Sequence, residues 1–206
     1  MKKMAQQSDK NSPEEYDRIY FSRKEKGVDD FDKRRWKKLL KYYRGGKLLD
    51  VGCLDSLVPD IAKKLYPKAE VWGIDVAEQA VKDMQERFPD VVYRVEDAYQ
   101  TKFPKNYFDY IVAGEIIEHL EEPDRFLSEM LRILKHGGCL AISTPENEAI
   151  EPGAVDGERH LWSWTVGDIQ DWLDDYGTAV INTMGSEYFP VYKYHFPNIL
   201  AYLFKK

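Results

Sequence analysis

The stretch Lys47-Leu48-Leu49-Asp50-Val51-Gly52-Cys53 has the pattern of a short buried strand that ends in a glycine turn. A second apolar run, Val71-Trp72-Gly73-Ile74-Asp75, ends on an acid 25 residues after Asp50. That separation leaves room for one crossover helix between two parallel strands. The two runs therefore predict a nucleotide-binding half of an α/β sheet.

The alternation of strand and helix continues on both sides of this pair. Further strands are expected at 91–95, 108–114, 139–143, 179–188 and 199–204, and helices at 56–65, 78–88, 123–136 and 165–176. The loop between the last two strands is too short for a crossover helix, so these strands should pair as an antiparallel hairpin. Two helices should precede the sheet, the first capped by Ser12 and the second running from Asp29 or Asp30 to Gly45-Gly46.

Length and composition indicate one globular α/β domain in the cytoplasm. The chain has 206 residues, 43% of them hydrophobic and 32% charged, and it contains no apolar run near the ~20 residues that span a bilayer. We expect no membrane partner and no secretory signal. Residues 1–11 are polar and should form a flexible tail, and Cys53 and Cys139 should be core thiols.

The charge is unevenly distributed along the chain. The net charge is −6, which argues against a protein that holds duplex nucleic acid by neutralising phosphates. Residues 33–47 nevertheless contain eight basic residues and no acid, so the remainder carries −6 − 8 = −14. This run is either a solvated helix face or a docking surface for an anionic substrate.

The motifs taken together resemble the class I S-adenosylmethionine-dependent methyltransferases. The similarity rests on Asp50-Val51-Gly52, on Asp75, on the segment from Phe103 to Val112 and on Glu115-Ile116-Ile117-Glu118-His119-Leu120. It covers roughly residues 46–206 and implies a three-layer α/β fold. The sheet should be Rossmann-like, seven-stranded and mostly parallel, with a C-terminal antiparallel hairpin. We therefore expect residues 12–206 to form one methyltransferase domain, with an N-terminal helical cap at 12–45 and a core at 46–206.

The expected cofactor site lies at the carboxyl ends of the first strands. Gly52 lets the chain turn sharply where a Cβ would obstruct the ligand, and Asp75 is placed to accept both hydroxyls of a ribose. The resemblance implies that Asp97 receives the adenine amino group and that the Ala98 amide faces the ring. The predicted cofactor-binding set is Asp50, Val51, Gly52, Cys53, Asp75, Val76, Asp97, Ala98 and Glu115.

The first loop departs from the pattern of the family. The usual Gly-x-Gly-x-Gly becomes Gly52-Cys53-Leu54-Asp55-Ser56, so Leu54 and Ser56 replace two glycines. A residue with negative φ can still offer its backbone amide, so the cofactor prediction stands. The same change argues against an NAD dehydrogenase, in which these glycines make room for a pyrophosphate.

A second group of candidates follows the fourth strand. If Glu115, Glu118 and His119 start a helical turn, their spacing puts all three on one face. Two carboxylates and an imidazole suit a divalent ion such as Mg²⁺ or Mn²⁺. His160 is a fourth possible ligand, because residues 160–165 resemble a segment of small-RNA 3′-terminal 2′-O-methyltransferases whose metal site combines Glu-x-x-Glu-His with that histidine. Alternatively, His119 is a general base without a metal, and Glu118 assists it.

The function expected from the sequence is methyl transfer from S-adenosylmethionine to a hydroxyl oxygen of a small metabolite or sugar. Glu-x-x-Glu-His also occurs in ubiquinone-pathway O-methyltransferases. Two alternatives remain open, namely a metal-assisted RNA 2′-O-methyltransferase and a non-catalytic adenosylmethionine-binding module. A small-molecule acceptor is favoured over nucleic acid, and the protein is either a monomer or a homodimer.

Overall fold

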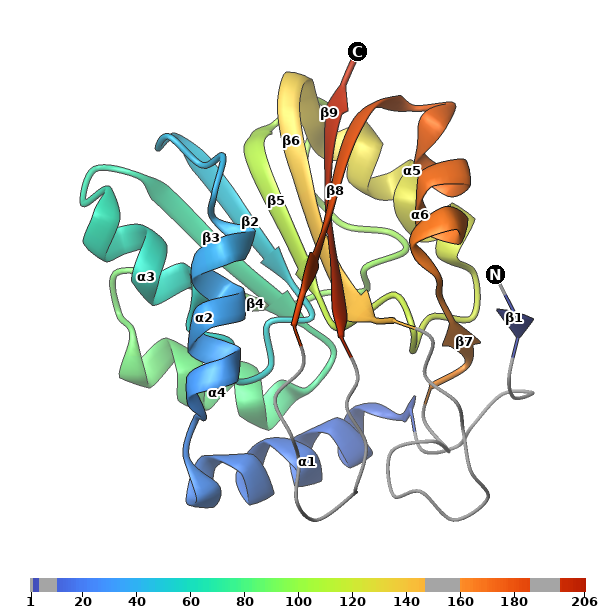
Figure 1. The fold of residues 1–206 in the computed structure, drawn as a ribbon. Helices are drawn as coiled ribbons and strands as arrows, with labels where there is room; N and C mark the ends of the chain where they lie inside the picture. Colours follow the sequence, from blue (N-terminus) through green and yellow to red (C-terminus); the bar gives the residue numbers. More distant parts are fainter. Residues whose placement is uncertain (1, 4–10, 147–159, 186–196) are drawn as a thin grey trace.

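The computed structural model describes residues 2–3, 11–146, 160–185 and 197–206 (Figure 1). Its strands are β1 (Lys2–Lys3), β2 (Lys47–Val51), β3 (Glu70–Asp75), β4 (Val92–Val95), β5 (Phe108–Gly114), β6 (Leu134–Pro145), β7 (Trp162–Ser163), β8 (Gly177–Met184) and β9 (Asn198–Lys205). Its helices are α1 (Pro13–Lys26), α2 (Asp30–Leu39), α3 (Val58–Leu65), α4 (Glu78–Arg87), α5 (Pro123–Ile133) and α6 (Val166–Asp174).

Seven strands form the central sheet in the order β4-β3-β2-β5-β6-β9-β8. The first five are parallel, and β9 runs antiparallel to both of its neighbours, β6 and β8. The predicted seven-stranded sheet with a C-terminal antiparallel hairpin is therefore confirmed. The chain order of the strands reverses beside β2, and ligands of α/β sheets bind at such a switch point, outside the carboxyl ends of the strands.

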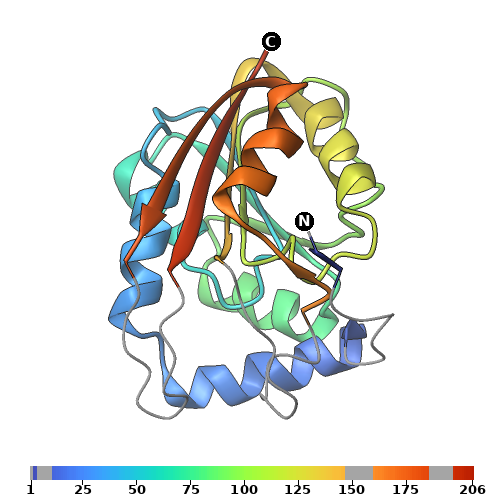
Figure 2. The same ribbon diagram turned by 45° about the vertical axis from the view of Figure 1, so that its right-hand side comes forward.

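Helices cover both faces of the sheet and complete the three predicted layers. α2, α3 and α4 pack on one face and α5 and α6 on the other (Figures 1 and 2). Each face has its own buried cluster, centred on side chains such as Leu48 and Val112 on the first face and Leu49 and Ile111 on the second. The strands of a sheet that is covered on both faces must be apolar on both sides, which explains the continuous apolar runs in the sequence.

Three predicted boundaries need correction. α2 ends at Leu39 rather than at the glycine pair, and the turn that follows lets Leu40 and Tyr43 pack into the core. α5 ends at Ile133, because Leu134 already pairs with Phe108 and starts β6. The expected stop of α6 at Gly177 lies after the helix, in β8.

α1 lies across the carboxyl ends of the central strands (Figure 1). The Ser12 side chain accepts a hydrogen bond from the Glu15 amide and caps the helix as predicted, and Asp17 accepts from the Ala80 amide at the start of α4. The expected tail at 1–11 lies mostly outside the described residues; Lys2–Lys3 pair with β7. None of the described helices is long and apolar enough to cross a membrane.

Candidate functional site

The carboxyl ends of β2, β3 and β5 bring the predicted cofactor residues to one edge of the sheet. Val51 pairs with Ile74 on one side and with Ala113 on the other, so the residues that follow these strands lie abreast. Gly52 adopts φ +67°, and a Cβ on it would lie 2.8 Å from Ile116 Cδ1. Glycine is thus required there by the backbone conformation and by packing, in addition to the predicted approach of a ligand.

The loop after β2 is closed by its own backbone. The amides of Gly52 and Cys53 both donate to the Ile74 carbonyl, and the Ser56 amide donates to the Cys53 carbonyl. The Leu54 amide donates to Asp75 Oδ2 at 2.9 Å. Of the two residues that replace glycines, Leu54 uses its amide to hold the loop against β3 and Ser56 uses its amide to close the loop on itself.

Asp75 is buried at the end of β3, with both carboxylate oxygens engaged. Besides Leu54, the Ala77 amide donates to Oδ1 at 3.0 Å. Burial raises the pKa of Asp75, while the backbone amides oppose that rise. Each carboxylate oxygen has two lone pairs, so the group keeps acceptor capacity for ribose hydroxyls. Val76 follows directly and is half-buried.

Asp50 is the most deeply buried acid of this region. Its Oδ2 has no hydrogen-bond partner among the described residues, and burial raises its pKa to about 7. A hydrogen bond from Ser56 opposes this rise and the charge of Asp75 adds to it. Burial also raises the pKa of the Cys53 thiol, which fits a core residue.

The adenine candidates lie beyond β4. Asp97 is exposed, and its Oδ1 accepts a hydrogen bond from the Tyr99 amide at 2.8 Å. Ala98 beside it is half-buried. Both residues thus follow the strand next to β3, at the same edge of the sheet as Asp75.

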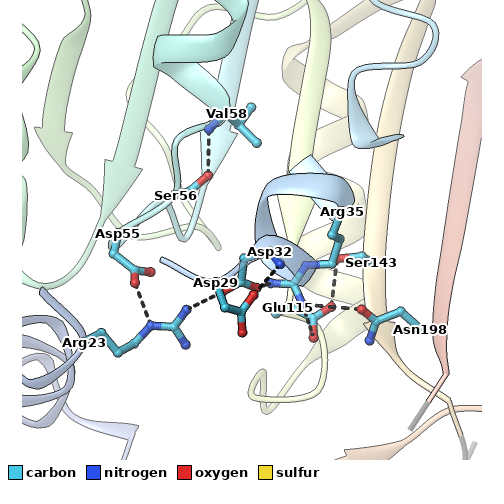
Figure 3. A network of polar contacts seen from close by, with 10 residues as sticks. All are labelled: Arg23, Asp29, Asp32, Arg35, Asp55, Ser56, Val58, Glu115, Ser143 and Asn198. Carbon is cyan, nitrogen blue, oxygen red and sulfur yellow. Dashed lines mark hydrogen bonds and ion pairs between the residues drawn. The ribbon is translucent and has the colours of Figure 1, made fainter. Parts of the chain in front are cut away.

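Glu115 points away from the other two members of its motif. Its φ is +55°, and its carboxylate forms an ion pair with Arg35 at 3.2 Å and accepts from Ser143 Oγ at 2.8 Å (Figure 3). The expected helical turn is not formed: the chain makes a turn at 117–119, and the next helix begins only at Pro123. The expected single face of Glu115, Glu118 and His119 is therefore wrong.

Sequence reasoning missed a chain of ion pairs that joins this edge to the N-terminal helices. Arg35 of α2 also contacts Asp32 at 2.6 Å, and Arg23 of α1 bridges Asp32 at 3.1 Å and Asp55 of the first loop at 2.6 Å (Figure 3). The signal was present, because Arg35 stands between apolar residues on the inner face of α2. A charged residue on such a face needs a buried partner.

Glu118 is fully buried with half of its carboxylate unpaired. Thr144 Oγ1 donates to Oε2 at 3.1 Å, and Oε1 has no partner among the described residues. Burial raises the pKa of Glu118, and the neighbouring charge of Glu115 adds to the rise. A buried carboxylate oxygen without a donor is suited to a proton or to a cation.

His160 joins Glu118 and His119 from a distant part of the chain. One ligand atom from each of the three residues lies within 4.8 Å of the others, and the two imidazole rings are 4.5 Å apart. Backbone hydrogen bonds hold His160 in place, since the Leu161 amide donates to the Glu118 carbonyl at 2.6 Å. Trp162 Nε1 also donates to the Leu120 carbonyl at 2.6 Å.

The start of α1 lies over His119. The Asn11 side chain donates to the His119 carbonyl at 3.3 Å, and the Tyr16 hydroxyl donates to Asn11 at 3.0 Å. The Tyr16 ring meets the imidazole edge to face, with centroids 6.1 Å apart. The other aromatic residue of this helix that faces inward, Tyr20, contacts Asp83 of α4 instead.

The central part of the chain is similar to known methyltransferases. Residues 49–142 match a family model described as a methyltransferase domain. A probable S-adenosylmethionine-dependent methyltransferase of Mycolicibacterium smegmatis is 27% identical over 147 residues, which cover 68% of this chain and 55% of that protein. The ubiquinone/menaquinone biosynthesis C-methyltransferase UbiE of Bordetella parapertussis is 35% identical over 103 residues, covering 48% and 40%. The chain thus matches about half the length of these relatives.

Solved structures agree on the fold. A SAM-dependent methyltransferase from Archaeoglobus fulgidus superposes with a TM-score of 0.72 at 16% identity, covering 92% of this chain and 99% of that one. The [4+2]-cyclase SpnF superposes with a TM-score of 0.61 at 21% identity, covering 82% and 80%. One fold therefore hosts different reactions, and function has to be argued from the site.

Proposed function

Since the chain carries a class I S-adenosylmethionine-dependent methyltransferase domain, we propose that it transfers a methyl group from S-adenosylmethionine to a small acceptor. The observation that carries the proposal is the edge formed by Gly52, Asp75 and Asp97, with His119 in the turn that follows β5, the strand paired with β2. The ribose hydroxyls would bind Asp75, and the adenine amino group would bind Asp97. The sulfonium would then lie toward the end of β5.

The cofactor part of the proposal is tested by calorimetric titration with S-adenosylmethionine and S-adenosylhomocysteine. Asp75→Ala should weaken binding by about 100-fold, because charge-assisted hydrogen bonds are worth ~1.5–3 kcal/mol each. Asp90→Ala, at an exposed aspartate far from the edge, is the matched control and should change nothing. Unchanged affinity in a folded Asp75→Ala protein would contradict the ribose assignment.

In the proposed reaction the acceptor is a hydroxyl oxygen of a small metabolite or sugar. The oxygen attacks the methyl carbon, the bond between this carbon and the sulfonium breaks, and S-adenosylhomocysteine leaves. The sulfonium is already activated, so the protein mainly aligns the reactants and removes one proton. His119 takes this proton, since an imidazole titrates near neutral pH. Glu118, beside it, would stabilise the imidazolium that forms.

A carbon acceptor is the competing choice, because the relatives named UbiE are C-methyltransferases. The proton would then leave the attacked carbon after the new bond forms. Transfer of a ¹³C-labelled methyl group across a panel of hydroxylated and enolic acceptors, followed by carbon NMR, separates an O-methyl from a C-methyl product. Cofactor binding without any methylated product would instead favour a non-catalytic binding module.

A second candidate function is metal-assisted transfer, favoured by the unpaired Oε1 of Glu118 beside His119 and His160. Two imidazoles and one carboxylate fit a divalent ion, and they suit Mn²⁺ better than Mg²⁺. Such an ion would lower the pKa of an acceptor hydroxyl, as in an RNA 2′-O-methyltransferase. Glu115 would not be a ligand unless it gave up Arg35 and Ser143.

The metal candidate is tested without turnover. Mn²⁺ should raise the melting temperature of the protein, and Glu118→Gln or His160→Ala should abolish this shift. Glu121→Gln, at an exposed neighbour of the turn, should preserve it. If neither Mn²⁺ nor Mg²⁺ changes the melting temperature, the metal candidate is contradicted, and His119 would act as a base without a metal.

A further inference from the structure

The outer face of α2 and the turn after it carry a continuous row of cations. We call this row the basic face; its members are all exposed and comprise Lys33, Arg34, Lys37, Lys38, Lys41 and Arg44. The opposite side of the helix is buried against the sheet through Phe31, Trp36 and Leu39. α2 lies at the margin of the molecule in Figure 2.

Most of this charge is not neutralised within the described residues. Lys33 forms an exposed ion pair with Asp30 at 3.2 Å. The side-chain ammonium groups of Lys37 and Lys38 form no ion pair or hydrogen bond with any described residue. Lys41 lies over the Tyr42 ring, and the Arg44 guanidinium donates to the backbone carbonyls of Lys41 and Tyr43. The helix dipole accounts for a cation or two in the last turn, but the row extends beyond the end of α2 to Lys41 and Arg44.

The shape of the basic face selects among anionic partners. The surface is one convex helix, and its only aromatic side chain, Tyr42, is packed edge to face against Tyr202 and Phe204. A single-stranded nucleic acid needs a groove and exposed rings on which bases stack. Leu65, which is 60% exposed, lines a hollow together with Gly45 and Gly46, directly after Arg44. Cations beside an exposed apolar side chain fit a flat anionic surface better than they fit a single-stranded nucleic acid.

We propose that the basic face docks the protein on anionic phospholipid. The rest of the chain carries −6 − 6 = −12, which disfavours contact of its other faces with a negative surface. Docking of this kind is peripheral and needs no spanning helix; the expectation of no membrane partner rested on hydropathy, which does not detect a charged face. Arg34 faces outward and Arg35 inward toward Glu115, so the docked face lies one helix away from the candidate site. The proposal does not depend on methyl transfer.

The test is sedimentation of the full chain with vesicles. Vesicles that contain phosphatidylserine should bind the protein at low salt, and vesicles of phosphatidylcholine alone should not. A Lys37→Glu/Lys38→Glu/Lys41→Glu variant should lose this binding, since each cation near an anionic surface contributes about fivefold in affinity. The matched control is Lys82→Glu/Lys102→Glu/Lys105→Glu, which changes the net charge equally at exposed lysines elsewhere.

Each outcome decides the proposal. Binding that is lost in the α2 variant, retained in the control and weakened by salt supports it. Equal loss of binding in both variants would mean that net charge, and not the basic face, determines vesicle binding, which contradicts the proposal. Absence of binding to anionic vesicles at low salt would also overturn it. Tighter binding of a single-stranded RNA than of vesicles, abolished by the α2 substitutions, would reassign the face to nucleic acid. A Lys37→Gln/Lys38→Gln/Lys41→Gln variant with an unchanged melting temperature repeats the test if the glutamates unfold the helix.

Discussion

Two halves of the same sheet edge are built in different ways. The nucleotide half consists of Asp50, the loop 52–56 and Asp75. The hydrogen bonds that close its loop on β3 span at most 22 residues between donor and acceptor, as from Gly52 to Ile74, and the Arg23–Asp55 ion pair adds one contact with α1. The transfer half consists of the turn 115–119 and His160. It is held by Asn11, 108 residues before His119, and by Trp162, 42 residues beyond Leu120. One half is thus locally encoded, and the other is assembled by the whole fold.

This difference separates affinity from chemistry. A locally closed loop keeps its shape when distant parts of the chain move, so the nucleotide half should hold the cofactor whatever happens at His119. The transfer half depends on α1, β6 and the segment 160–164 together. We therefore expect substitutions in the two halves to affect different measured quantities.

The largest expected effect is on turnover in the transfer half. His119→Gln should lower kcat by about 10²- to 10⁴-fold, the usual contribution of a positioned general base, while the Kd for S-adenosylhomocysteine changes less than threefold. Steady-state kinetics with the identified acceptor and calorimetry measure the two quantities. His136→Gln is the matched control, because this exposed histidine shares a hydrogen bond with the Lys206 carbonyl and belongs to neither half. A loss of cofactor affinity as large as the loss of turnover would show that the halves are not separable.

The second prediction concerns the pH dependence of stability in the nucleotide half. Burial raises the pKa of Asp50 from 3.8 to about 7, so the folded protein keeps a proton there that the unfolded chain has already lost above pH 4. Stability should therefore fall as the pH rises from about 4 to 7. Asp50→Asn removes this penalty and should stabilise the protein at pH 8 by at most about 4 kcal/mol.

Urea denaturation of the cofactor-free protein at pH 4.5 and pH 8 checks this prediction. The gain from Asp50→Asn should shrink toward zero at the lower pH, where the wild-type carboxyl is protonated in the folded state. Asp90→Asn, at an exposed aspartate, should be neutral at both pH values. An equal effect of Asp50→Asn at both pH values would mean that packing, rather than ionisation, dominates at this position.

The same contrast explains what could be predicted from the sequence. The strands and the position of Gly52 and Asp75 at their carboxyl ends follow from local signals, namely apolar runs that end in a glycine or in an acid. The order of the strands in the sheet came from the structure. Turn geometry is local too, yet the predicted helical turn at Glu115 failed. Its left-handed φ is stabilised by Arg35 and Ser143, which come from α2 and β6. No pattern within residues 115–119 contains that information.

His160 and Arg35 show what a sequence can and cannot predict about a site. His160 was found through a resemblance of the segment around it, although nothing local connects it to Glu118. Arg35 was counted among the surface cations, but it is buried between two acids. Its position on the apolar face of α2 was the available signal. Tertiary contacts decided both cases, which is why the transfer half needed the structure.

The smallest expected effect probes the packing of Gly52 against Ile116, which joins the two halves directly, in addition to the chain of ion pairs from Asp55 to Glu115. Gly52→Ala puts a Cβ 2.8 Å from Ile116 Cδ1 and forces alanine to φ +67°, which costs about 1–2 kcal/mol by itself. Gly137→Ala measures the cost of a positive φ without crowding, because Gly137 has φ +73° with no atom near its absent Cβ.

The excess of Gly52→Ala over Gly137→Ala is the cost of crowding Ile116. Ile116→Val removes the crowding atom, so in the double variant this excess should shrink, giving a coupling energy of about 1 kcal/mol in urea denaturation. The affinity for S-adenosylhomocysteine should recover in parallel, because the loop returns to its original position. If the two substitutions were strictly additive, Ile116 would move aside at no energetic cost. The stability of the nucleotide half would then not depend on packing against the turn 115–119.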